Sequence, residues 1–122
     1  MISEAMLEEM IDHIVSGIYA DYPDLLTKYG EQGKERCRED NGHHFRTLEV
    51  AYEMKNKKIF QDYAEWLNHL LTSRGMSSEH IIDNFNRILA VIKGKDLNGK
   101  EPFFNECLRT AINDLRKGEE TI

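Results

Sequence analysis

This 122-residue chain is poor in the features that usually mark a secreted, redox-active or membrane protein. Its only cysteines, Cys37 and Cys107, are far apart in sequence and form neither a disulfide framework nor a Cys-x-x-Cys motif. No stretch approaches the roughly 18 consecutive apolar residues of a membrane-spanning helix. The N-terminus has no basic segment followed by an apolar run, so we expect no signal peptide. We therefore expect a cytoplasmic protein whose thiols stay reduced.

Positive charge is also scarce. The chain has 16 Lys and Arg residues against 22 Asp and Glu residues, which gives a net charge of −6 at pH 7. A protein that neutralises nucleic-acid phosphates needs a basic surface, and anionic membranes attract the same residue types. We therefore expect neither nucleic acid nor a membrane as a partner.

Motifs of the common enzyme classes and metal sites are missing as well. The sequence contains no Gly-x-Gly-x-x-Gly fingerprint, Walker loop, Gly-x-Ser-x-Gly elbow, His-Glu-x-x-His pair or EF-hand loop. Each of these motifs fixes backbone donors, a nucleophile or metal ligands in the geometry that its chemistry needs. Their absence favours a protein without catalytic activity.

The spacing of apolar residues predicts helices throughout. The two prolines, Pro23 and Pro102, stand where helices would begin, and the alternation typical of strands is absent. We expect an all-α fold, either a five- or six-helix bundle or a globin-like array. The predicted helices cover residues 3–20, 24–39, 45–52, 59–74, 78–92 and 102–117.

The chain is predicted to form one helical domain, residues 1–122. The polar stretch 93–100 is predicted to be a flexible linker before the last helix. Gly118 is predicted to end that helix, and residues 118–122 to form a frayed tail.

Asn41-Gly42 leaves two interpretations open: a helix ends there, or it continues through both residues. A continuous helix would align one row of residues, which we call the seam: Leu26, Gly30, Gly33, Cys37, His44, Leu48 and Ala51. Small residues in its first half would let another backbone or a ligand approach closely. Alternatively, these glycines mark turns.

The pair His43 and His44 is the most suggestive candidate for a binding site. Adjacent helical residues do not share a face, so at most one imidazole points inward. His44 lies on the seam with Cys37, so both side chains would face one cavity. There His44 would serve as a haem ligand, a metal ligand or a hydrogen-bond donor to a bound molecule. The alternative is a core histidine with satisfied hydrogen bonds.

Two larger groups of residues also have two interpretations. The basic residues on the predicted helix surface near Cys37 either bind an anion or pair with acidic neighbours: Arg36, Arg38, His43 and Arg46. The aromatic residues at helical spacing either form the core or line a ligand pocket: Phe45, Phe60, Tyr63, Trp66, Phe85, Phe103 and Phe104.

Several short stretches between Tyr29 and Ile92 carry a family resemblance. They are Tyr29-Gly30, Arg36-Cys37, Glu39-Asp40, His43-His44-Phe45 with Leu48, Phe60-Gln-Asp-Tyr63, Trp66-Leu67, Leu70-Leu71 and Arg74-Gly75. This run resembles the helical segment that precedes cobalamin-binding domains in some bacterial sensor proteins. It is also loosely similar to the globin-like N-terminal domains of RsbR-type proteins. The Asp-x-His-x-x-Gly loop of cobalamin-binding domains is absent. The resemblance therefore implies a sensory or interaction module and leaves its ligand unspecified.

We accordingly expect a homodimeric helical sensor or interaction module that binds a protein partner or a small ligand, with no cofactor. Its expected binding residues are His44, Cys37, Tyr63, Trp66, Arg36 and His43. One alternative is a haem- or metal-binding protein that uses His44. Another is an enzyme with an unrecognised His/Glu site.

Overall fold

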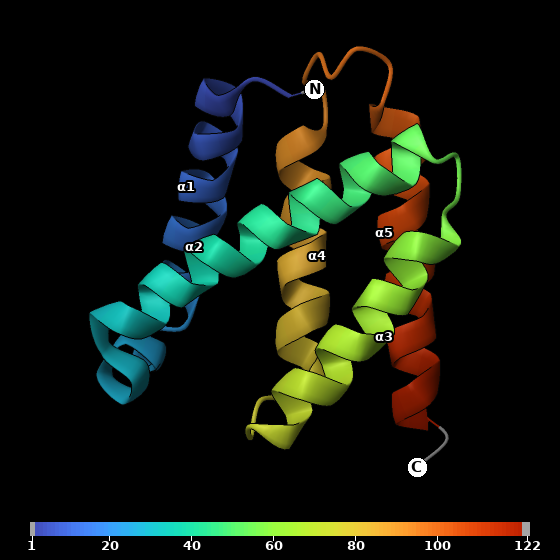
Figure 1. Ribbon diagram of the computed structural model, residues 1–122. Coiled ribbons are helices and arrows are strands. Elements are labelled where there is room, and N and C mark those ends of the chain that lie inside the picture. The colour runs from blue at the N-terminus through green and yellow to red at the C-terminus, as the bar shows by residue number, and fades with distance from the viewer. Residues whose placement is uncertain (1, 121–122) are drawn as a thin grey trace. The chain divides into compact units, whose positions relative to one another are not determined.

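All regular secondary structure is helical over the residues that the computed structural model describes, 2–120, with side chains described as far as Gly118. This part contains five helices and no strand, which confirms the predicted all-α bundle (Figure 1). The chain divides into two compact units between Arg46 and Thr47. Each unit is compact in itself. The expectation of a single domain stays a prediction.

The first unit contains α1 (Glu4–Asp21) and the beginning of α2 (Asp24–Glu53), the blue and cyan segments of Figure 1. The hydroxyl of Ser3 caps α1 by accepting a hydrogen bond from the Met6 N–H at 3.2 Å. An ion pair between Asp12 and Arg38 joins the two helices. The buried residues of α1 are apolar and lie at helical spacing: Met10, Ile11, Ile14, Val15 and Ile18.

Helix α2 runs unbroken through Asn41-Gly42, so the continuous-helix interpretation is correct. Its irregularity lies at Gly30, with φ 70° and ψ −170°, a backbone conformation essentially restricted to glycine. The kink brings Tyr29 back over Gly33, where a Cβ atom would lie 2.5 Å from the Tyr29 Cβ. Gly30 and Gly33 together therefore permit the kink, and Gly42 is an ordinary helical position with open space around it.

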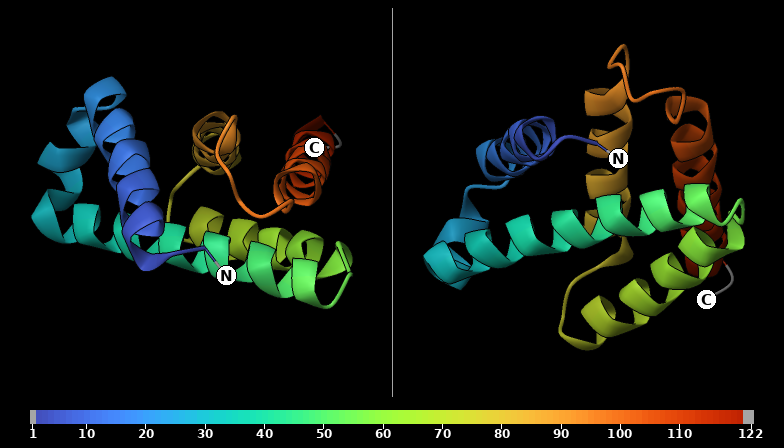
Figure 2. Two further views of the ribbon diagram at one scale, coloured as in Figure 1. Left: turned by 90° about the horizontal axis from the view of Figure 1, so that it is seen from above. Right: turned by 45° about the horizontal axis from the view of Figure 1, so that its top comes forward.

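The second unit contains the end of α2 together with α3 (Lys58–Ser73), α4 (Ser78–Ile92) and α5 (Glu101–Glu120). Helices α4 and α5 lie side by side, and α3 contacts both (Figure 2). The centre of this unit contains large side chains with at most 2% exposure: Leu48, Phe60, Ile82, Phe85, Ile88, Ile92, Phe104 and Leu108. The predicted apolar stripes of the last three helices therefore face one another.

The ends of α3 and α4 follow the predicted signals. Gly75, with φ 89°, reverses the chain after α3. Ser77 occupies the N-cap of α4, and its N–H donates to Nδ1 of His80 at 3.3 Å. The Ser78 hydroxyl donates to Oδ1 of Asn68 at 2.7 Å, which fixes the start of α4 to α3. The short connection between these helices is thus determined locally.

The flexible-linker prediction for residues 93–100 is wrong. Leu97 is buried, and so is Lys100, whose Nζ lies 3.7 Å from Oε1 of Glu49 and 5.5 Å from the centroid of the Tyr52 ring. One apolar anchor and one buried ion pair therefore hold this connection against the end of α2.

The prediction for the C-terminus is also wrong where the structure describes it. Helix α5 begins at Glu101 and continues through Gly118 to Glu120. Glycine lowers helix stability without forbidding the helix, so Gly118 alone does not end it. Residues 121–122 of the predicted tail lie outside the described residues.

None of the helices between residues 2 and 120 combines the length and apolarity needed to cross a lipid bilayer.

Candidate functional site

The six predicted site residues lie in both units. Helix α2 carries four of them in the first unit, and α3 carries the other two in the second unit. The α2 group is Arg36, Cys37, His43 and His44, and the α3 group is Tyr63 and Trp66.

His44 is the imidazole that points inward: it is 3% exposed, whereas His43 is exposed to solvent. Burial, with a smaller contribution from the neighbouring His43, lowers the pKa of His44 from 6.5 to about 3. The side chain is therefore neutral at physiological pH, the state in which imidazole binds a metal. Among the described side chains, no cluster of three or more His, Cys, Asp or Glu residues could hold a metal ion. The metal- or haem-binding alternative consequently rests on His44 alone and stays a prediction.

Cys37 is half-buried, and its thiol resists ionisation. Burial, followed by the negative charge of Asp40, raises the Cys37 pKa to about 11, against the opposing effects of Arg38 and Asn41. The buried Asn41 amide donates to the Cys37 carbonyl at 3.0 Å and approaches its sulfur at 3.8 Å. A thiolate is the reactive form of cysteine, so this site is poorly suited to nucleophilic catalysis.

The basic residues around Cys37 do not act as one group. Arg38 forms an ion pair with Asp12 of α1, whereas Arg36, His43 and Arg46 are exposed. One of the four predicted anion-binding side chains thus contributes to the packing of the first unit.

The seam is buried in only part of its length. His44, Leu48 and Ala51 are buried as predicted, but Leu26 is 40% exposed. The kink at Gly30 changes the direction of the chain, so residues before it no longer share a face with those after it. Gly30 therefore marks a change of chain direction, as the alternative interpretation held, whereas Gly33 is helical.

Phe85 of α4 and three aromatic residues of α3 form a row that leads from the core to the surface. Ring centroids are 5.4 Å apart for Phe85 and Phe60, 5.7 Å for Phe60 and Tyr63, and 6.1 Å for Tyr63 and Trp66. The first two residues are fully buried, Tyr63 is partly exposed, and Trp66 is 58% exposed. Trp66 is therefore not a core residue, which was one of the two interpretations that its spacing left open. Its ring packs on one side against Tyr63 and presents the other side to solvent.

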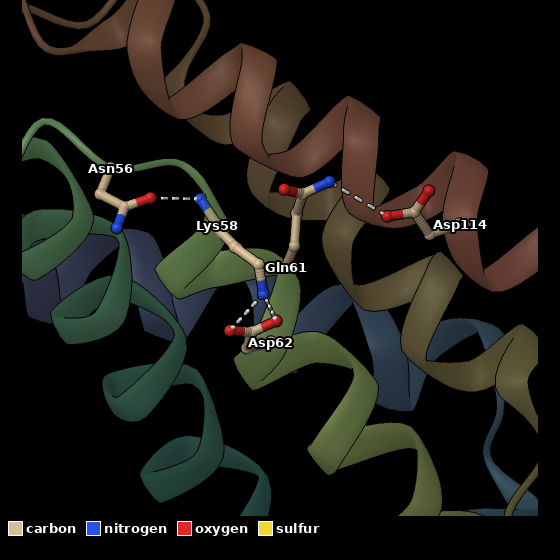
Figure 3. Close-up of polar contacts among 5 residues, drawn as sticks. All are labelled: Asn56, Lys58, Gln61, Asp62 and Asp114. Atoms are coloured by element: carbon tan, nitrogen blue, oxygen red, sulfur yellow. Dashed lines mark hydrogen bonds and ion pairs between the residues drawn. The ribbon is translucent and has the colours of Figure 1, made fainter.

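Polar contacts surround the first turns of α3 (Figure 3). The Asn56 side chain accepts a hydrogen bond from the Lys58 N–H at 3.0 Å and satisfies a donor at the start of the helix. The Lys58 ammonium pairs with Asp62 at 3.0 and 3.1 Å. Gln61 donates to Asp114 of α5 at 3.3 Å. Of these contacts, the one between Gln61 and Asp114 joins α3 to α5.

Sequence reasoning missed the buried pair of Lys100 and Glu49. The available signal was Leu97, a single large apolar residue inside an otherwise polar stretch, which indicates an anchored turn. A polar stretch with two glycines is typical of an exposed loop, so the composition concealed the anchor.

Comparison with protein-family models, curated proteins and solved structures finds no match for this chain.

Proposed function

We propose that the protein is a non-catalytic helical interaction module and that α3 docks on α3 of a second copy through the face centred on Trp66. The observation that supports this proposal is the exposed position of Trp66 at the end of the aromatic row. Tryptophan and tyrosine are the residue types most enriched among the side chains that dominate protein interfaces. The resemblance to bacterial sensor segments points to the same class of protein and stays a prediction.

The shape of the face supports a helix as the docking element. Ile59, Tyr63 and Leu70 are partly exposed and lie with Trp66 at positions three and four apart, which forms one stripe along α3. A stripe of this spacing fits against a helix with a similar stripe. Because Tyr63 already supports the Trp66 ring, docking would order few side chains and lose little conformational entropy.

The charges along α3 support an antiparallel arrangement of two copies. The acidic side chains Asp62 and Glu65 precede Trp66, with Asp62 paired to Lys58, and the basic side chain Arg74 follows it. No acidic residue occurs between Trp66 and Arg74. A two-fold axis near Trp66 would therefore place Asp62 and Glu65 of one copy in the same half of the interface as Arg74 of the other, with the Lys58 ammonium already paired to Asp62.

The test is the self-association of purified protein, measured by sedimentation equilibrium for the unmodified chain and for Trp66→Ala. Loss of a central aromatic anchor removes at least about 2 kcal/mol of binding free energy, so the dimer dissociation constant should rise about 30-fold or more. The matched control is Tyr29→Ala, which removes an exposed aromatic residue from the first unit and should leave the constant unchanged. A monomeric unmodified chain, or equal effects of the two substitutions, would contradict the proposal.

A further inference from the structure

The sequence contains the dipeptide Asn-Gly twice, at Asn41-Gly42 and Asn98-Gly99. Asparagine is a thermolabile residue, and a following glycine offers the least steric hindrance to attack by its backbone nitrogen on the asparagine side chain. The structure gives these two identical dipeptides opposite environments.

Asn98 and Gly99 form the exposed tip of the connection between α4 and α5. Both have positive φ, 57° and 82°, and the Lys100 N–H donates to the Leu97 carbonyl at 3.2 Å. This geometry is the type I′ turn that Asn-Gly favours. The Asn98 N–H is occupied by Oδ1 of Asp96 at 3.1 Å, whereas no hydrogen bond holds the Gly99 N–H within the described part of the chain.

Asn41 and Gly42 lie inside α2. Asn41 is fully buried, and its side-chain amide donates to the Cys37 carbonyl at 3.0 Å. Gly42 is helical, so its N–H belongs to the helix ladder and cannot approach the Asn41 side chain without local unfolding.

We propose that Asn98 is a site of spontaneous deamidation in the folded protein and that Asn41 is protected from it. The Gly99 backbone nitrogen loses its proton and attacks Cγ of Asn98. A new C–N bond forms, the Cγ–Nδ2 bond breaks, and the side-chain nitrogen leaves as ammonia. Water then opens the resulting succinimide at either carbonyl and produces aspartate or isoaspartate. Water is the only co-reactant, and no oxidation or reduction occurs.

The modification would act on the buried ion pair next to the turn. Isoaspartate lengthens the backbone by one carbon atom between Leu97 and Lys100, both of which are buried. Lys100 can keep its position against Glu49 only if the turn keeps its length. The isoaspartate product therefore loosens the hold of this connection on α2, whereas the aspartate product adds a negative charge at an exposed position.

The test compares deamidation at the two asparagines in the folded, full-length protein at mildly alkaline pH. Peptide mass mapping follows the replacement of the amide NH₂ by OH at each site, with a parallel sample in concentrated urea. Reaction at Asn41 must wait for α2 to open, so Asn98 should convert at least about tenfold faster in the folded protein. The two rates should converge in urea. An Asn98 rate no greater than that of Asn41 in the folded state would overturn the proposal.

A second experiment tests the effect of isoaspartate on the turn. The isoaspartate form, separated by ion exchange from aged protein, should unfold at a lower denaturant concentration than the variant Asn98→Asp. That variant carries the same added charge on a backbone of normal length. Equal midpoints would show that the backbone change has no effect on the anchored turn.

Discussion

His44 is the residue whose ionisation is most strongly coupled to folding. Its pKa falls from 6.5 to about 3 on burial, so between these values the unfolded chain binds a proton that the folded chain excludes. The stability contributed by the neutral imidazole is fully present above pH 6.5 and is lost progressively as the pH falls below that value.

Replacing His44 should therefore flatten the acid branch of the stability profile. We expect the unfolding free energy of the unmodified protein to carry a slope of about 1.4 kcal/mol per pH unit from this group between pH 6 and pH 4. His44→Gln should lose that slope, whatever its stability at neutral pH. His43→Gln, at the exposed neighbouring position, should retain it. Urea unfolding at a series of pH values measures both, and parallel profiles for the two variants would refute the assignment.

The aromatic row predicts that two rings of α3 contribute very differently to the free energy of unfolding. Phe60→Ala should lower the unfolding free energy by about 3–5 kcal/mol because the ring is fully buried. Trp66→Ala should lower it by less than about 1 kcal/mol at concentrations where the chain is monomeric, because its ring faces solvent on one side. Denaturant titrations followed by circular dichroism distinguish these effects. Similar losses in both variants would mean that Trp66 is part of the core.

Among the elements, α2 depends most on single glycines. Gly30 adopts a conformation that other residues reach only under strain, and Gly33 has no room for a Cβ atom beside Tyr29. Gly42 lies in the same helix with helical geometry and open space around it. Three glycines of one helix thus have two different roles.

Alanine substitutions should distinguish these roles by the sign of the change in unfolding free energy. Gly30→Ala should destabilise the protein by about 1–3 kcal/mol through backbone strain. Gly33→Ala should also destabilise it, because its Cβ would displace Tyr29. Gly42→Ala should stabilise it by about 0.5–1 kcal/mol, because alanine loses less conformational entropy in a helix. Thermal unfolding of the three variants gives the comparison, and destabilisation by Gly42→Ala would contradict the helical geometry at that position.

The helices could be predicted from sequence because their apolar spacing and caps are local. Ser77 caps the start of α4 and Gly75 follows the end of α3, and both are residue types typical of these positions. The kink in α2 could not be placed, because Gly30 and Gly42 are the same residue type and only tertiary packing distinguishes them. The exposure of Trp66 could not be predicted, because apolar residues cover much of the circumference of α3 and sequence does not say which part of so wide a stripe stays uncovered.

At the scale of the whole molecule, the two candidate sites have different chemistry. His44 and Cys37 are a neutral imidazole and a protonated thiol. The inward position of His44 followed from the seam spacing, which sequence provides. Tyr63 and Trp66 instead form an exposed, supported aromatic surface. Sequence names both residues as binding candidates, but their exposure depends on what is left uncovered after folding and is seen only in three dimensions.

Salt and charge reversal should affect the proposed dimer less than removal of its anchor. Arg74 lies at the end of α3 and is exposed, so Arg74→Glu should weaken association by about 0.2–1 kcal/mol, or severalfold at most in the dissociation constant. Sedimentation equilibrium at low and high salt measures this change in the dissociation constant. An effect of Arg74→Glu larger than that of Trp66→Ala would contradict a dimer centred on the aromatic face.

The most direct test of the proposed interaction face uses the fact that Trp66 is the only tryptophan in the chain. Its fluorescence can be recorded over a dilution series, with iodide quenching at each concentration. Docking of α3 on a second copy predicts short-wavelength, poorly quenched emission at high concentration, and a shift to longer wavelength with stronger quenching on dilution. Emission that stays solvent-exposed and unchanged at every concentration would contradict the account.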